Sequence, residues 1–285
     1  MKDPVAKDEP EIPGPVLCAH LLREVDARLL ELLASLRPGE WELQTVAPEW
    51  RVRDAAAHLL DTALRKLSMV RDHWFVEPAT VRSPEDVAAL VNRLNHEGVT
   101  VYRRLSPPVL ISLMTVACRD YAEYHESLDP FAQSVFPVSW AGEERSLNWF
   151  DTARELTERW HHQQQIRYAT GRPGIMIPRL YHPVLDCFMR GMPYAYRRVD
   201  AEPGTAIRVE ITGDCGGVWQ IRRTATGWIL MTPADPLNSR VVIPQEIAWR
   251  LFTRGIGRKA AETEVCIEGD RALGLRALEL TAIVA

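Results

Sequence analysis

The sequence predicts an all-α bundle of the four-helix type followed by a small α+β domain. Over the first two thirds of the chain, apolar residues recur three or four positions apart, which is the spacing of one helix face. After the stretch DAEPGTA (200–206), short segments alternate between apolar and polar residues, with glycine-containing turns between them. We therefore expect a flexible N-terminal segment over residues 1–14, the bundle over 15–199 and the α+β domain over 205–285, with the boundary near 199–205.

Long helices are expected throughout the bundle. Helical periodicity covers residues 16–36, 52–70, 83–105, 109–128, 148–168 and 181–199. Ser83 is predicted to cap the third of these helices, because serine is a favoured N-cap residue. Gly171 and Pro173 are predicted to end the fifth. The stretch 129–146 shows no clear period and is expected to be irregular.

The C-terminal domain is expected to combine a few short strands with two helices. Strand patterns cover residues 206–212, 217–223, 227–232 and 263–269. A helix is expected over 244–255, and a final helix is expected to start at Asp270, whose side chain reads as an N-cap.

The composition is ordinary for a soluble globular protein and argues against several classes of function. The 285 residues are 46% hydrophobic and 25% charged, with a formal net charge of -4. Without a strong basic field, nucleic acid is a poor partner. No apolar run reaches membrane-spanning length, and the start of the chain is acidic and proline-rich, unlike a secretion signal. We expect a cytoplasmic protein with neither a nucleic-acid nor a membrane partner.

The five cysteines are scattered along the chain. They stand at positions 18, 118, 187, 215 and 266, with no CxxC pair among them. An odd number at irregular spacing favours neither a disulfide framework nor a cysteine-bound zinc ion. We expect most of them to be small buried hydrophobic residues in a reducing compartment.

The stretch ELTERWHHQQQIR (155–167) raises the possibility of a metal site. Glu158 and His162 are four positions apart, so on a helix they lie nearly above one another and can bind one divalent ion together. His161, three positions from Glu158, is an equally adjacent partner. A Glu/His pair at this spacing is more often a solvated surface pair, and spacing alone leaves both the site and the choice of histidine open.

A helical wheel separates these polar residues from the apolar stripe of the same helix. Glu158 and His162 lie about 150° or more from its centre, at roughly 100° per residue, whereas His161 lies nearer its edge. His58 is displaced in the same way on the helix over 52–70. Two interpretations follow: the polar faces of both helices are exposed to solvent, or they face each other across a cleft. Residues 131–146 or the C-terminal domain are the candidate covers of such a cleft.

Two further residues have weaker claims to a functional role. Arg254 is a candidate for binding a substrate carboxylate, because a guanidinium matches a carboxylate in a bidentate pair. A cation that favours the end of a helix is the more common explanation at such a position. His125 is a possible metal ligand, although a histidine there more often caps a helix or pairs with a carboxylate.

Two motifs then connect the sequence to a known family. EWRVRDAAAHLLD, with Trp50, Asp54 and His58, resembles the W-x-V-x-D-x-x-x-H-L motif of DinB-like, mycothiol-dependent maleylpyruvate isomerases. ERWHHQQQI resembles the family's second motif, E-x-W-x-H-x-x-D-I, with Glu158 and His162 in register. The C-terminal segments GVWQI, WRLFTRG and IEGDRALGLRAL resemble the sterol-carrier-like domain that often follows this bundle.

The resemblance implies one divalent metal ion, often zinc, with nickel or another metal as alternatives, held by His58, Glu158 and His162. It thereby selects His162 over His161. A low-molecular-weight thiol would be the cosubstrate. The sequence departs from the family motif at Gln165, where an aspartate is usual. An amide at this position can still accept a hydrogen bond from the His162 ring and so orient it. It adds no negative charge that would make the imidazole a stronger ligand.

Three functions remain in competition. The first is an enzyme of the maleylpyruvate isomerase type, in which a metal-activated thiol acts on a small electrophilic or unsaturated acid as an isomerase or S-transferase. The second is a metal-water hydrolase or amidase on the same three residues, and the third is a small-molecule binding protein with a structural metal. In each case we expect a small-molecule ligand, and a homodimer is possible.

Overall fold

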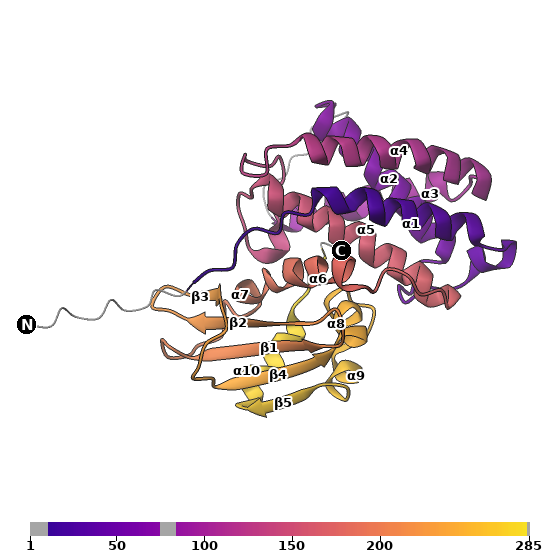
Figure 1. Cartoon of the computed structure of the whole chain (residues 1–285). Coiled ribbons are helices and arrows are strands. Elements are labelled where there is room, and N and C mark those ends of the chain that lie inside the picture. Colours follow the sequence, from indigo (N-terminus) through magenta and orange to yellow (C-terminus); the bar gives the residue numbers. More distant parts are fainter. Residues whose placement is uncertain (1–10, 75–83, 284–285) are drawn as a thin grey trace, which may run out of the picture.

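The structure, a computed structural model, describes residues 11–74 and 84–283. Long helices form its N-terminal part and a five-stranded sheet lies below them in the view of Figure 1. The bundle helices are α1 (Leu22–Ser35), α2 (Val52–Arg65), α3 (Pro84–Tyr102), α4 (Pro107–Ser127) and α5 (Asn148–Thr170). The predicted order of an all-α bundle followed by an α+β domain is confirmed. None of the described helices is long and apolar enough to cross a membrane.

Most of the bundle helices end where the sequence predicts. Pro107 and Pro108 occupy the first turn of α4, where a missing N–H costs nothing. Gly171 ends α5 with a left-handed backbone (φ 65°), and its N–H is bonded to the carbonyl of Arg167. Ser83, the predicted cap of α3, lies outside the described residues.

The helix predicted over 181–199 is wrong in its extent. It is divided into α6 (Pro178–Met189) and α7 (Met192–Ala195), with the break at Gly191. A Cβ on Gly191 would lie 2.9 Å from the Leu280 side chain and 3.0 Å from the Trp140 ring. This close approach of the backbone to two packed side chains explains the glycine.

The sheet has the order β3-β2-β1-β4-β5. The strands are β1 (Ala206–Thr212), β2 (Gly217–Arg223), β3 (Trp228–Met231), β4 (Ser239–Pro244) and β5 (Cys266–Gly269). All neighbouring pairs are antiparallel except β1 and β4, which are parallel. β4 was not predicted from the sequence, because its apolar core is only Val241–Ile243 and its pairing with β1 is not local.

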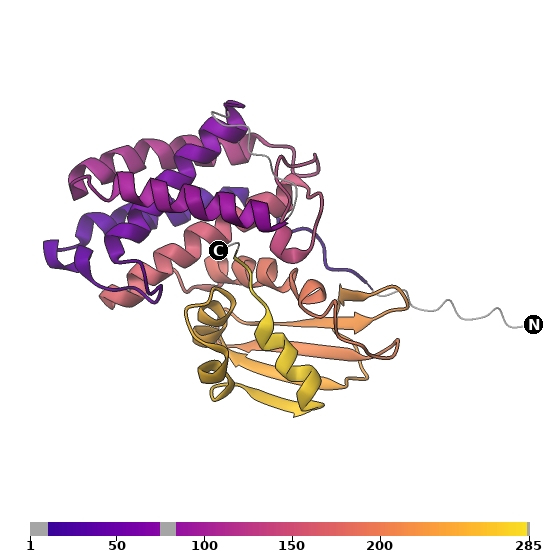
Figure 2. The same cartoon turned by 180° about the vertical axis from the view of Figure 1, so that it is seen from behind.

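The remaining helices cover the sheet and join it to the bundle. α8 (Gln245–Phe252) and α9 (Arg258–Glu262) follow β4, and α10 (Arg271–Arg276) crosses one face of the sheet, as Figure 2 shows from behind. Asp270 caps α10 as predicted, accepting the Leu273 N–H at 3.0 Å. α6 lies between the bundle and the sheet (Figure 1), and the indole N–H of Trp219 on β2 donates to its Asp186 at 2.9 Å.

The N-terminal stretch before α1 is partly described. Residues 1–10, the larger part of the segment predicted to be flexible, lie outside the described residues. Glu11 accepts a hydrogen bond from the Thr232 N–H at 2.8 Å, and the Arg190 guanidinium donates to the carbonyls of Pro13 and Gly14. Residues 11–14 therefore contact α6 and the sheet domain.

Four of the five cysteines are buried, Cys266 is exposed, and all five are free thiols. The prediction that they act as small buried hydrophobic residues is confirmed for those four. Burial also raises the pKa of the Cys18 and Cys118 thiols to about 12, so neither is a thiolate near neutral pH.

α5 buries both its apolar and its polar face. Trp160, in the apolar stripe, stacks on Tyr181 of α6 at 4.2 Å and meets Trp249 of α8 edge-on. The stripe thus packs against α6 and the C-terminal domain. The opposite, polar face packs against α2 and α1 in the interior of the bundle. The interpretation of two solvated faces is therefore wrong, and α2 and α5 present their polar faces to each other.

Candidate metal centre

Three side chains from two helices meet between α2 and α5. Nε2 of His58 lies 2.8 Å from Oε1 of Glu158, and Nε2 of His162 lies 3.1 Å from the same oxygen. One possible ligand atom from each residue falls within 4.8 Å of the other two. The imidazoles are buried, at 1% and 6% exposure, while the Glu158 side chain keeps 28%. The structure thus brings together the three residues on which the two sequence motifs converge.

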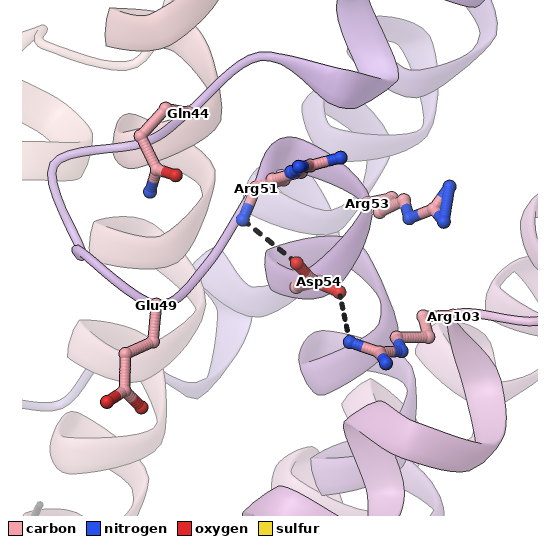
Figure 3. Close-up of a pocket in the computed structure, with 6 residues that line it drawn as sticks. All are labelled: Gln44, Glu49, Arg51, Arg53, Asp54 and Arg103. Atoms are coloured by element: carbon pink, nitrogen blue, oxygen red, sulfur yellow. Dashed lines mark hydrogen bonds and ion pairs between the residues drawn. The ribbon is translucent and has the colours of Figure 1, made fainter.

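Local sequence positions His58 on α2. The Arg51 N–H donates to Oδ2 of Asp54 at 3.0 Å (Figure 3), so the carboxylate at the third helical position caps the start of α2. Three alanines separate Asp54 from His58 and two leucines follow it, and these residues favour helix. His58 therefore lies one turn after Asp54, on the same side of α2.

Trp50 covers the two histidines. Its ring centroid lies 4.6 Å from that of His58 and 5.2 Å from that of His162. Hydrogen bonds within the loop fix the backbone at Trp50. The Gln44 amide donates to the Trp50 carbonyl at 2.8 Å, and the Thr45 hydroxyl donates to the same oxygen at 2.7 Å. The sequence analysis identified Trp50 only as part of a motif; its contact with both histidines depends on the tertiary fold.

The two cover segments considered from the sequence pack elsewhere. Trp140, from the irregular stretch 131–146, packs edge-on against Phe150, two turns before Glu158 on α5. Trp249, from the C-terminal domain, packs against Trp160 on the apolar side of α5. The aromatic cover of the histidines comes instead from the loop before α2.

The donor set fits a bound cation. Nδ1 of His162 lies 2.9 Å from Oε1 of Gln165, an oxygen that can only accept, so Nδ1 carries the proton. In a neutral ring, Nε2 then turns a lone pair toward a carboxylate oxygen, which also has only lone pairs to offer. A cation between them removes this conflict. Ligand atoms around a tetrahedral zinc ion are roughly 3.3 Å apart, close to the spacing seen here.

The pKa values favour the forms of these groups that bind metal. Burial, and then the charge of His162, lower the pKa of His58 to about 4, so its ring is neutral at pH 7. Burial alone would raise the pKa of Glu158. The charges and hydrogen bonds of the neighbouring histidines outweigh it and hold that pKa well below its ordinary value. A neutral imidazole beside a carboxylate is the protonation state that divalent metals bind.

A buried ion pair fixes the two helices beside the centre. Arg159 follows Glu158 and is 1% exposed. Its guanidinium is hydrogen-bonded to Asp26 of α1, to the carbonyl of Leu59 at 3.2 Å and to the sulfur of Cys118 at 2.9 Å. One side chain therefore ties α5 to α1, α2 and α4 immediately next to both His58 and Glu158.

Other candidate residues lie outside this group. Nδ1 of His161 lies 2.9 Å from the Thr157 carbonyl of its own helix, and burial lowers its pKa to about 3. Nδ1 of His125 lies 3.0 Å from the Thr152 hydroxyl. Arg254 is exposed on the C-terminal domain, just after α8, with a positive φ of 59°. The His161 ring contacts the His162 ring, with the centroids 3.8 Å apart, but its Nδ1 faces the backbone of its own helix rather than Glu158.

Comparisons with known proteins agree with the fold. Residues 22–167 match the family model described as "Mycothiol maleylpyruvate isomerase N-terminal domain", a span that contains His58, Glu158 and His162. A solved mycothiol-dependent maleylpyruvate isomerase shares the fold at a TM-score of 0.50 and 11% identity, over 82% of this chain and 86% of its own. A mutant of a mycothiol-dependent maleylpyruvate isomerase matches over the same shares, at 11% identity and a TM-score of 0.48. No match was found among curated proteins.

Proposed function

Because the chain belongs to the mycothiol maleylpyruvate isomerase N-terminal domain family, we propose that it is a metal-dependent enzyme that uses a low-molecular-weight thiol. Its substrate would be a small electrophilic or unsaturated acid, and its reaction an isomerisation or an S-transfer. The observation that carries this proposal is the convergence of two imidazoles and one carboxylate in a buried, partly open cluster.

His58, Glu158 and His162 would hold the divalent ion, with zinc favoured and nickel as an alternative. The ion would supply Lewis-acid chemistry that lowers the pKa of a bound thiol. Gln165 would keep the His162 ring in the tautomer that presents Nε2. Trp50 would exclude water from one side of the two imidazoles.

In the isomerase reaction, the thiolate sulfur would add to one carbon of a cis double bond. The displaced electron pair would be held by the conjugated carbonyl of the acid. Rotation about the resulting single bond and expulsion of the thiolate would give the trans isomer and return the thiol unchanged. In an S-transfer, the sulfur would remain on the product.

Arg254 is proposed to bind the carboxylate of the acid. It precedes Gly255, where an added Cβ would lie 3.1 Å from the Val46 side chain, in the same loop as Trp50. The positive residue therefore stands beside the loop that covers the cluster. We expect Arg254→Gln to raise KM for the acid by roughly tenfold or more, the cost of one charge-assisted pair. The metal content of the Arg254→Gln variant should equal that of the parent.

The experiment that tests the function is turnover of cis-unsaturated acids by the zinc-loaded protein, with and without added thiol. The proposal predicts turnover only when metal and thiol are both present. Turnover that needs metal but no thiol would favour the hydrolase or amidase instead. If a metal-depleting His58→Ala variant loses thermal stability, and no substrate is turned over by either protein, the metal is structural and the proposal fails.

A further inference from the structure

A pocket lies at the end of the bundle where α5 begins. Its volume is about 300 Å³, and it opens between residues 17–20, the last turn of α4 and the first turn of α5. Thr152, in its lining, precedes Glu158 by six residues, which is about 9 Å along α5 and roughly 120° around it. The pocket is therefore separate from the candidate metal centre, and its size is that of a small-molecule pocket.

Most of the residues that line this pocket are apolar. They are Leu17, Cys18, Ala19, Leu128, Pro130 and Trp149. Leu17 is 54% exposed and Cys18 is 2% exposed, so the apolar wall runs from the surface into the interior. A ligand that covers this wall would remove apolar surface from water, which favours a largely apolar molecule.

His125 lies in the same lining and has one ring nitrogen without a partner. The residue is 2% exposed, and its Nε2 is buried without a hydrogen bond from the described part of the chain. Nδ1 lies 3.0 Å from the Thr152 hydroxyl. Burial, and then the charge of Lys66, lower the pKa of His125 to about 4, so the ring is neutral at pH 7 and carries one proton.

The contact with Thr152 favours the tautomer that has this proton on Nε2. If Nδ1 were protonated, it would donate to the hydroxyl oxygen, and the hydroxyl proton would then lack an acceptor among the described contacts. When the hydroxyl donates to Nδ1 instead, both groups are satisfied and the Nε2–H of His125 is left as a buried donor. A buried donor without an acceptor is costly, which points to an acceptor that a ligand supplies.

The charges of the lining favour a neutral ligand. Both carboxylate oxygens of Glu126 already accept from the Arg23 guanidinium at 2.7 Å. None of the described lining residues is a lysine or an arginine. The first N–H groups of α5, at Asn148 and Trp149, are bonded to backbone carbonyls at 2.9 Å, so they are not open to an anion. A cation, in turn, could not accept a hydrogen bond from His125.

We propose that this pocket binds a neutral, mainly apolar small molecule that carries one hydrogen-bond acceptor, such as an aryl ketone. Its acceptor would pair with Nε2 of His125, and the rest of the molecule would contact the apolar wall. The proposal does not depend on the function proposed for the metal centre.

The test is a set of ligand-observed NMR titrations of the full-length protein with acetophenone, ethylbenzene, benzoate and benzylammonium as separate probes. The first two probes share a ring with a two-carbon substituent and differ by one carbonyl oxygen. Both should bind, and neither ion should bind measurably. His125→Phe should weaken acetophenone roughly tenfold, the loss of one hydrogen bond, and change ethylbenzene by less than about twofold.

Leu17→Glu tests the apolar wall at an exposed position, where folding is not at risk. It should weaken acetophenone and ethylbenzene alike, by roughly fivefold or more. Leu113→Glu is the matched control, because Leu113 is 45% exposed on α4 and is not part of the lining, and it should leave both affinities unchanged.

His58→Ala separates this pocket from the metal centre and should leave the binding of both neutral probes unchanged. Loss of acetophenone binding in His58→Ala would place that probe at the metal centre and overturn the proposal. The proposal also fails if no neutral probe binds, if an ion binds more tightly than both neutral probes, or if His125→Phe weakens acetophenone no more than ethylbenzene.

Discussion

The interior of the bundle holds two polar clusters that share the same pair of helices, and they differ in charge balance. In the first, Lys66 at the end of α2 donates to Asp151 at 2.6 Å and to Glu155 at 3.1 Å. Arg154 pairs with both carboxylates, and the Tyr121 hydroxyl donates to the second oxygen of Glu155 at 2.5 Å. Every carboxylate oxygen of this cluster has a partner from the chain itself.

In the second cluster, His58 and His162 converge on Glu158, and the group contains no lysine or arginine. With Nδ1 of His162 bonded to Gln165, a neutral ring would turn the lone pair of Nε2 toward the carboxylate. The first cluster is completed by Lys66 and Arg154 and is a structural ion network. The second, on the function proposed above, would be completed by a bound cation.

The largest expected effect comes from removing the cation of the first cluster. Lys66→Met leaves Asp151 and Glu155 buried with less compensation, and we expect the free energy of unfolding to fall by about 3–5 kcal/mol. Urea denaturation measures this loss. Lys259→Met, at an exposed lysine, is the control and should change stability by less than about 0.5 kcal/mol. Equal stability of the two variants would contradict the structural role of the first cluster.

The corresponding change in the second cluster should affect metal affinity more than stability. Glu158→Gln keeps the shape of the side chain but removes the charge. We expect zinc affinity to fall by more than about 100-fold, because even residues behind the ligands contribute 10–100-fold. The metal-free variant should also lose some stability relative to the metal-free parent, because the neighbouring histidines favour the ionised form of Glu158. Competition with a chromophoric chelator gives the affinity, and retention of zinc by the variant would argue against Glu158 as a ligand.

The pH dependence of stability follows from the buried histidines. Burial, and then the charge of Lys66, lower the pKa of His125 from 6.5 to about 4. Between these values the unfolded chain binds more protons than the folded one, so the free energy of unfolding falls as pH falls from about 6.5 to 4. His125 accounts for about 3 kcal/mol of this loss at most. Denaturation of metal-free protein at several pH values should show a shallower slope for His125→Gln; an unchanged slope would exclude His125 as a source.

The smallest expected effect is at Gln165. Replacing this neutral partner of His162 by a carboxylate adds negative charge behind the imidazole and makes it a stronger ligand. We expect Gln165→Glu to raise zinc affinity by about tenfold in the same chelator competition, with stability nearly unchanged. Weaker zinc binding would show that His162 does not use Nε2 as the ligand atom.

Local signals made much of this molecule predictable. The helix stop at Gly171 and the Asp270 cap each depend on one or two adjacent residues, and both were found in the sequence. The helix predicted from residue 109 starts two residues earlier, because prolines are tolerated in a first turn. The strand β4 was missed because its pairing with β1 joins segments far apart in the chain.

The candidate site was only partly predictable for a similar reason. Position on α5 showed that Glu158 and His162 lie away from Trp160, but a buried polar face and a solvated one have the same pattern. What makes this face an interior one is a set of partners on other helices, such as Asp26 for Arg159 and the Val25 carbonyl for Gln163. The family motif, rather than spacing, selected His162 over His161.

The central claim is tested most directly by the metal content of the purified protein beside His58→Ala, Glu158→Ala, His162→Ala and His161→Ala. The account predicts about one equivalent of divalent metal in the parent and in His161→Ala, and little in the other three. Metal that is absent from the parent, or that survives all four changes, would contradict it. Loss with His161→Ala and retention with His162→Ala would show that the ligand on α5 is the neighbouring histidine.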